Sequence, residues 1–281
     1  MNRVRVLYHG GRCLDGFGAA WAAWMHFRTT ETAVDYQAMS HGDPVPEVAG
    51  ETVYLLDYCL KREPLQALCE SASRVVVLDH HESAAKDVAG LDEVCTNLAL
   101  HFDMHRSGAV IAWEYFHTEP VPVLLEWIQD RDLWAWQWPE SRDATAALMA
   151  RPYDFGLWQA LAEDEDARQT LVSEGAAINR FRQQMIEHYR KRAVMGTVAG
   201  YRVPVVNAPV EIQSELLGEL AVGHPFAAGY LDREGRRGWS LRSTADGLNV
   251  ADIARRFGGG GHPRAAGFST PLPDDNFSVN P

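Results

Sequence analysis

The chain has 281 residues, more than one domain usually holds, and this length favours two domains. Its composition is 46% hydrophobic and 10% aromatic with nine tryptophans, which excludes a largely disordered chain. The formal net charge of -12 excludes tight binding to long nucleic acid, because that binding depends on a basic surface. A small phosphorylated substrate fits this charge better, and short oligonucleotides stay allowed.

The apolar runs are too short to cross a bilayer, and the first residues lack the apolar region of a signal peptide. We therefore expect a cytoplasmic protein with no membrane partner. The four cysteines show no CxxC spacing, which favours reduced thiols over a disulfide framework. The oligomeric state is left open, with a homodimer allowed.

The first part of the chain alternates short apolar segments with helical patterns. Strands are predicted over residues 4–8, 52–56 and 74–78. Helices are predicted over residues 18–27 and 63–71. Alternating strands and helices predict a parallel sheet with both faces covered.

The pattern then becomes helical and later changes to short strands. Helices are predicted over residues 108–116, 121–130 and 174–192. Strands follow over residues 202–206, 226–230 and 238–242, with a helix over residues 215–221. A loose tail is predicted after Pro271.

The fold class that we expect is α/β, with an N-terminal parallel-sheet domain joined by a helical connection to a smaller α/β C-terminal domain. The predicted boundaries are 1–180 for the first domain, 181–200 for the connection and 201–281 for the second domain.

Six chemically active side chains lie within a residue or a short loop of the carboxyl ends of predicted strands. They are His9, Asp15, Asp57, Asp79, His80 and His81. In an open α/β sheet those ends converge on one crevice, where ligands bind. Each residue alone also has a structural interpretation, such as Asp15 capping the helix that follows it.

The cluster as a whole points to bound cations. No Lys or Arg stands beside Asp57 or Asp79, so the gathered carboxylates would repel one another. Divalent ions relieve that repulsion, and a mixed His and Asp set suits Mn2+, with Mg2+ or Co2+ as alternatives. Two such ions can polarise a phosphoryl oxygen and convert a bridging water into a nucleophile.

Five motifs in order carry a resemblance to a known family. The chain has His9-Gly-Gly-Arg-Cys-Leu-Asp-Gly, Leu56-Asp57, Asp79-His80-His81, Asp130-Arg-Asp-Leu-Trp and Gly258-Gly-Gly-Gly-His262-Pro-Arg-Ala-Ala-Gly-Phe. The first four resemble motifs of the DHH phosphoesterases. The fifth resembles the Gly-rich motif of the DHH-associated C-terminal domain, so the similarity spans almost the whole chain.

The resemblance implies a role for each matched residue. His9 would hold the first metal and Asp57 would bridge both ions. Asp15, His80 and Asp130 would hold the second metal. Asp79 would orient His80, and His81 would face the substrate phosphoryl group.

Cys13 departs from the family pattern, which has Asp at this position. A thiol is a poor ligand for hard cations unless it is deprotonated. Three outcomes stay open: an active enzyme with a weaker or water-completed first site, a thiolate ligand, or lost catalysis.

The Gly-rich segment is the predicted substrate-binding element. Consecutive glycines let backbone N–H groups turn toward an anion. The resemblance implies substrate contacts from Gly259, Gly260, Gly261 and His262, together with Arg242 and Ser243. For Arg264 only its charge and position support a contact.

The sequence therefore predicts an enzyme, a metal-dependent phosphohydrolase that cleaves phosphoester or phosphoanhydride bonds in small nucleotides or short oligonucleotides, including exonuclease action on the latter. One alternative is an exopolyphosphatase-like enzyme, since the resemblance also implies polyphosphate and cyclic dinucleotides. A second is a catalytically weak nucleotide-binding or sensor protein. A dinucleotide-cofactor enzyme is disfavoured because the first loop lacks GxGxxG.

Overall fold

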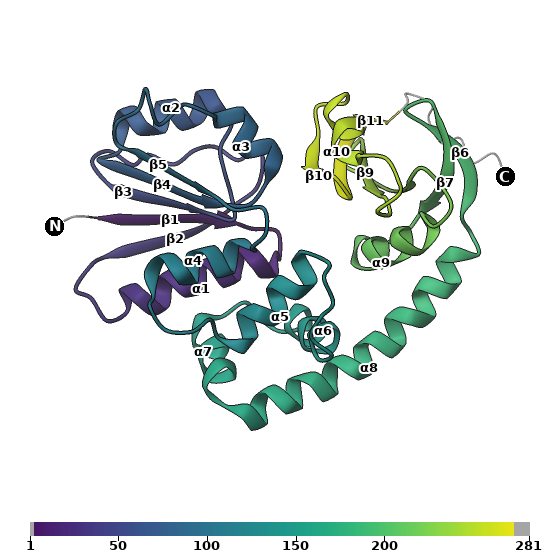
Figure 1. Cartoon of the computed structure of the whole chain (residues 1–281), viewed down its shortest axis with the longest axis horizontal. Coiled ribbons are helices and arrows are strands. Elements are labelled where there is room, and N and C mark those ends of the chain that lie inside the picture. The colour runs from purple at the N-terminus through teal and green to yellow at the C-terminus, as the bar shows by residue number, and fades with distance from the viewer. Residues whose placement is uncertain (1–2, 273–281) are drawn as a thin grey trace. The chain divides into compact units, whose positions relative to one another are not determined.

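The computed structural model describes residues 3–272 of the chain. The chain divides between Arg180 and Phe181 into two compact units, which we call the first and the second unit. Figure 1 shows the elements of each unit in chain order. The tail predicted after Pro271 lies outside the described residues apart from Leu272.

A five-stranded sheet forms the centre of the first unit. Its strands are β1 (Val4–His9), β2 (Val34–Met39), β3 (Thr52–Leu56), β4 (Arg74–Asp79) and β5 (Leu98–Phe102). The order is β2-β1-β3-β4-β5, and all neighbouring strands are parallel. The predicted parallel sheet is confirmed, and it also contains β2 and β5, which were not predicted.

Helices cover both faces of this sheet (Figure 1). Helices α1 (Leu14–Phe27) and α4 (Gly108–Phe116) lie on one face, and α2 (Arg62–Ser71) and α3 (Glu82–Val88) lie on the other. In β4, Val76 and Leu78 join the core on the α1 side, while Val75 and Val77 join the other core. A strand buried on both faces is continuously apolar, which explains the run at residues 75–78.

The rest of the first unit is helical. It contains α5 (Val123–Asp132), α6 (Ser141–Ala150), α7 (Phe155–Glu163) and the start of α8 (Glu165–Arg190). Helix α8 begins nine residues earlier than predicted and continues into the second unit. The predicted helical connection over residues 181–200 needs correction, because α8 ends at Arg190 and Val194–Val198 forms strand β6.

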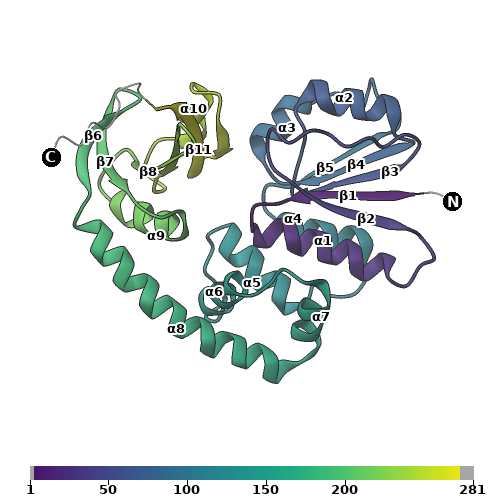
Figure 2. The ribbon, with the colours of Figure 1, turned by 180° about the vertical axis from the view of Figure 1, so that it is seen from behind.

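The second unit has its own six-stranded sheet. Besides β6, its strands are β7 (Tyr201–Asn207), β8 (Ala227–Arg233), β9 (Arg236–Arg242), β10 (Gly260–His262) and β11 (Ala265–Pro271), in the order β10-β11-β9-β8-β7-β6. Helices α9 (Val210–Leu220) and α10 (Val250–Arg255) pack against separate cores on opposite faces of this sheet (Figure 2). The predicted fold class, an N-terminal parallel-sheet α/β domain with a smaller α/β domain after it, is confirmed.

Among residues 3–272, no helix is both long enough and apolar enough to span a bilayer.

Candidate functional site

The topology of the first sheet brings the predicted chemical side chains to one place. With the order β2-β1-β3-β4-β5, the strand order reverses between β1 and β3, and ligands of such sheets bind at the carboxyl ends beside that reversal. His9 ends β1, Asp57 follows β3, and Asp79 ends β4 with His80 directly after it.

Asp57 stands at the centre of the cluster. Its carboxylate Oδ2 lies 3.3 Å from His9 Nδ1 and accepts a hydrogen bond of 3.5 Å from Cys13 Sγ. The other oxygen, Oδ1, lies 3.2 Å from His80 Nε2. The two oxygens of one buried carboxylate therefore face two different sets of partners. Asp57 also has a φ of +50°, a left-handed conformation that is uncommon outside glycine and that clusters at functional sites.

Two groups of ligand atoms meet at this carboxylate. The first contains His9, Cys13 and Asp57, and the second contains Asp15, His80 and Asp132. Within each group the nitrogen, sulfur or oxygen atoms lie within 4.8 Å of one another. In the second group, His80 Nε2 is 3.5 Å from an oxygen of Asp15 and 3.5 Å from an oxygen of Asp132.

Backbone N–H groups at the amino terminus of helix α4 hold the carboxylate of Asp15. The carboxylate accepts hydrogen bonds from the backbone N–H groups of Gly108 (2.7 Å) and Ala109 (2.9 Å). A side chain at position 108 would not fit, because its Cβ would lie 2.5 Å from the Cβ of Asp57. Gly108 thus lets the helix terminus approach both aspartates closely.

Asp132 was not among the predicted ligands, and it lies where Asp130 was expected. Asp130 is buried, and its carboxylate accepts bonds from Gln137 N (2.6 Å), Trp138 N (3.1 Å) and Ser141 Oγ (2.5 Å). These bonds hold the turn after α5, so Asp130 is a structural residue and not a member of either ligand group among the described residues. The structure therefore places Asp132, and not Asp130, beside His80 and Asp15, and the ligand role itself stays a prediction.

The Asp79 carboxylate contacts the ring of His81 as well as the backbone of His80. Its Oδ1 accepts the backbone N–H of His80 at 2.7 Å and lies 2.7 Å from His81 Nδ1. The prediction that Asp79 orients His80 therefore changes: the imidazole it fixes is that of His81. This pairing favours the tautomer with a proton on Nδ1, and it sets the direction of the other ring nitrogen.

Burial and neighbouring charges act together in the cluster. Burial, with the carboxylates of Asp57 and Asp132, raises the pKa of Asp15 well above its ordinary value. Burial would also raise the pKa of Asp57, but the imidazoles of His80 and His9 outweigh it and lower that pKa. Burial would lower the pKa of His80, yet the surrounding aspartates raise it to about 10. The crevice thus favours positive charge.

The donor set fits divalent cations. Carboxylate oxygens and imidazole nitrogens are ligands for Mn2+ and its neighbours, and ligand protons leave when such an ion binds. One further buried oxygen, Asp79 Oδ2, accepts no hydrogen bond from any residue that the structure describes. Cys13 is the only soft donor in the two groups; burial and then the charge of Asp57 raise the pKa of its thiol well above the ordinary value.

The Gly-rich segment of the second unit turns sharply. Gly258 has a φ of +76° and Gly261 a φ of +135°, both in the region that favours glycine. A Cβ at position 261 would lie 2.5 Å from the carbonyl oxygen of Ala265. The segment then forms β10, where His262 pairs with Ala265, and Ala265 in turn pairs with Arg242 on β9. The structure therefore brings Gly260, Gly261, His262 and Arg242 to one end of the second sheet.

The side chains beside this segment differ in their contacts. Arg242 donates to Ser214 Oγ at 2.7 Å, and Ser243 donates its hydroxyl to the carbonyl of Leu248 at 2.7 Å. Arg264 donates to the carbonyls of Gly247 (2.8 Å) and Ala245 (2.5 Å). These two bonds brace the loop before α10 and account for Arg264 without a substrate. Its substrate contact stays a prediction, as do those of Arg242, Ser243, Gly259, Gly260, Gly261 and His262.

Comparisons with known proteins found similarities in sequence and in fold. Residues 223–277 match the DHHA1 domain family. The chain is 28% identical to Uncharacterized protein R106 of Acanthamoeba polyphaga mimivirus over 286 aligned positions, 94% of this chain and 66% of that protein. The chain thus spans slightly less than two thirds of that relative's length.

Solved structures resemble the chain in fold. A crystal structure of the exonuclease RecJ bound to manganese has a TM-score of 0.52 at 16% identity, covering 95% of this chain and 86% of that one. The pGpG-specific phosphodiesterase PggH of Vibrio cholerae has a TM-score of 0.49 at 15% identity, covering 96% and 94%. Part of the second unit therefore matches the DHHA1 domain family, and the fold of the chain resembles that of the exonuclease RecJ.

Proposed function

We propose that this protein is a divalent-metal-dependent phosphohydrolase that cleaves phosphoester or phosphoanhydride bonds in small nucleotides or short oligonucleotides. One observation carries the proposal: the two oxygens of Asp57 face two separate ligand groups, His9 with Cys13 on one side and His80 on the other. A carboxylate shared between two such groups is the arrangement that a two-metal phosphoryl-transfer site requires. The DHHA1 match and the likeness in fold to a manganese-bound exonuclease support it.

In this proposal His9, Asp57 and Cys13 hold the first ion, and Asp15, His80, Asp132 and Asp57 hold the second. Bound there, Mn2+, Mg2+ or Co2+ would lower the pKa of a water ligand and neutralise phosphoryl charge.

The protein's own groups complete the chemistry. Burial would lower the pKa of His81, but Asp79 outweighs it and raises that pKa to about 9. A protonated His81 whose ring is fixed by Asp79 can donate a hydrogen bond to a phosphoryl oxygen, which gains charge in the transition state. The Gly-rich segment with His262 binds a phosphate of the substrate through backbone and side-chain N–H groups.

A substrate panel tests the function. Purified protein with Mn2+ should hydrolyse at least one of dinucleotides, 3'-phosphorylated nucleotides and cyclic dinucleotides, and a chelator should stop the reaction. Turnover of polyphosphate alone would favour the exopolyphosphatase-like alternative. Nucleotide binding without any turnover would favour a sensor protein, for which Cys13 in the first ligand group is the supporting observation.

Cys13→Asp should tighten Mn2+ binding at the first group by about tenfold, the scale on which changes around a metal alter its affinity. A hard ionised oxygen replaces a thiol there. The helix should tolerate the change, because Cys13 is the N-cap of α1 and accepts the N–H of Gly16, a position that Asp favours.

Calorimetric Mn2+ titration measures this effect, with Cys13→Ser as the matched control that removes the thiol without adding charge. Equal Mn2+ affinity in Cys13→Asp and the parent protein, at unchanged thermal stability, would show that position 13 does not contact the ion.

His262→Ala should raise KM by roughly 10- to 100-fold, the effect of losing one hydrogen bond to a charged group. Mn2+ affinity should not change, because His262 belongs to the second unit and the proposed metal ligands belong to the first. His224→Ala, in the same unit but outside the Gly-rich segment, is the control. Loss of Mn2+ binding in His262→Ala would contradict this division of roles.

A further inference from the structure

One face of the second sheet is only partly covered. Helix α10 has six residues and spans about 9 Å, whereas a seven-residue strand spans roughly 23 Å. The helix shares a core with Leu241 and Ala228. The next row on the same face, where Tyr230 pairs with Trp239, borders a hollow of about 590 Å³.

Aromatic rings continue across the strands from this hollow. The ring of Tyr230 lies 5.4 Å from that of Trp239, which is stacked on Phe268 at 5.9 Å. Phe268 is stacked in turn on Phe257 at 4.5 Å. Phe257 is 42% exposed and directly precedes Gly258, so this aromatic row ends where the Gly-rich segment begins.

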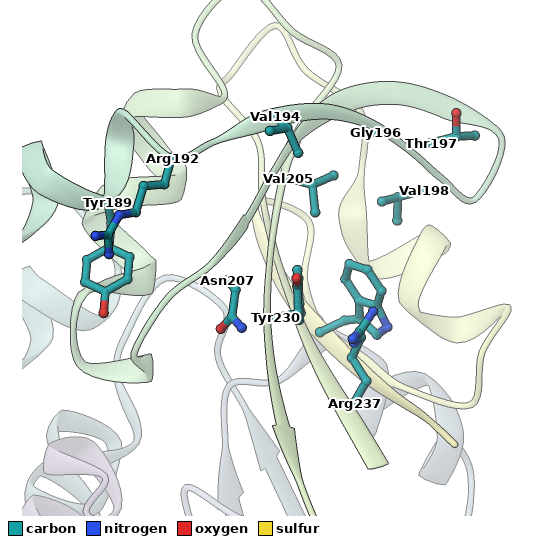
Figure 3. A pocket seen from close by; sticks show the side chains of 11 residues that line it. Tyr189, Arg192, Val194, Gly196, Thr197, Val198, Val205, Asn207, Tyr230 and Arg237 are labelled. Carbon is teal, nitrogen blue, oxygen red and sulfur yellow. The ribbon is translucent and has the colours of Figure 1, made fainter. Parts of the chain in front are cut away.

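Cationic and amide groups surround the hollow. Asp232 holds the guanidinium of Arg237 by two bonds, of 2.6 and 2.8 Å, so that it lies 4.1 Å from the centre of the Tyr230 ring. Figure 3 shows Arg192 on one side of the hollow, Arg237 on the other, and Asn207 between them. Flat guanidinium and aromatic surfaces are stacking partners for nucleobases, and an amide can bond to a base edge.

The charge of the chain is unevenly divided. Residues 181–281 contain 12 Lys and Arg against 10 Asp and Glu, a net charge of +2. Residues 1–180 contain 14 against 28, a net charge of -14. The acidity that disfavours nucleic acid thus belongs to the part with the metal ligands, and it does not oppose anion binding by the second unit.

Aromatic pairs across strands also stabilise sheets, which is the structural reason for such a row. That role explains the contact of Tyr230 with Trp239, but it does not account for two arginines and an asparagine around an open hollow.

We propose that Tyr230, Trp239 and the exposed Phe257, with Arg192 and Arg237, form a stacking platform for the bases of a short single-stranded oligonucleotide whose phosphate binds at the Gly-rich segment. The buried Phe268 packs between Trp239 and Phe257 and supports their rings. The inference rests on the proposed function for the class of substrate, but it assigns a separate surface.

Binding without turnover tests the platform. Fluorescence anisotropy of a labelled single-stranded DNA pentamer is measured with the full chain in chelator. Trp239→Leu and Tyr230→Leu keep an apolar side chain but remove a ring, and each should weaken binding about 5- to 150-fold, the effect of losing one stacked base. Trp239→Phe should retain most of the affinity. Phe181→Leu, an exposed aromatic of the same unit outside the platform, should bind like the parent protein.

Circular dichroism and melting curves check that each variant folds. Arg237→Gln removes a cation but no ring, and it should also weaken pentamer binding.

Pentamer binding that depends on Trp239, without hydrolysis of any nucleotide, would support the platform and reject the proposed function. If the protein hydrolyses nucleotides with metal, but Trp239→Leu and the parent bind the pentamer equally well, the platform is rejected and the proposed function is not. A dimer that Trp239→Leu dissociates, at unchanged pentamer affinity, would mean that this face joins two copies of the chain, and would overturn the proposal.

Discussion

Asp57→Asn should reduce metal-dependent hydrolysis by roughly 10³-fold, the upper range for removing one electrostatic stabiliser of a transition state. The residue supplies one oxygen toward His9 and Cys13 and the other toward His80, so losing its charge weakens both proposed ion sites at once. Asparagine suits the test because it matches the shape of Asp and tolerates the φ of +50° better than Ala does.

Turnover and Mn2+ titration of the same preparation measure this effect. Asp92→Asn, at an exposed position of the first unit, is the control for removing one carboxylate. Asp57→Asn should remain folded but melt at a lower temperature than the parent protein, because the lowered pKa of Asp57 means that its ionised carboxylate stabilises the fold. Near-normal turnover with unchanged Mn2+ affinity would contradict the bridging role.

Asp132→Asn should lower hydrolysis by about 10²-fold or more and leave thermal stability unchanged. Its oxygen lies 3.5 Å from His80 Nε2, within the second ligand group, and its side chain is 30% exposed. Burial and the charge of Asp57 raise the pKa of Asp132 while His80 opposes them, so the neutral amide removes a carboxylate that is costly to keep ionised. Activity assays and melting curves give both quantities.

Asp130→Asn is the matched comparison, two positions away on the same helix, and it should show the opposite result. Its carboxylate accepts bonds from Gln137 N, Trp138 N and Ser141 Oγ, and weakening them should destabilise the fold by about 1.5–3 kcal/mol. Residual activity per folded molecule should stay within a few-fold of the parent. Lost Mn2+ binding in Asp130→Asn, with normal binding in Asp132→Asn, would restore Asp130 as the ligand.

The sequence could not predict which of Asp130 and Asp132 faces the crevice. Successive residues of a helix are about 100° apart, so residues 130 and 132 point in directions that differ by about 200°. Only one of them can face the crevice, and the packing of α5 decides which. The sequence did indicate a structural role for Asp130. This residue precedes a Trp-rich turn and Ser141, and the backbone N–H groups of the turn and the Ser141 hydroxyl need an acceptor.

Strands β2 and β6 were not predicted because each lies at the edge of its sheet. Residues 34–39 of β2 lie at the edge of the first sheet and are mostly only half-buried, so they lack the continuous apolar run that identified β3 and β4. Strand β6 is also an edge strand, and the charged end of α8 before it led to the prediction of a longer helix. Edge strands bury one face or less, and their composition resembles that of loops.

Sequence alone predicts the parallel sheet, the family resemblance and the gathering of His9, Asp57, Asp79 and His80. Continuous apolar runs and polar residues at strand ends are local properties, and parallel topology brings the strand ends together. Packing in three dimensions sets which oxygen of Asp57 faces which partner, places Asp132 rather than Asp130 beside His80, and brings the Asp79 carboxylate to the His81 ring. It also forms the aromatic row, whose rings come from β8, β9, β11 and the turn after α10. Such contacts depend on strand register and helix rotation, which are set by packing between segments distant in the chain.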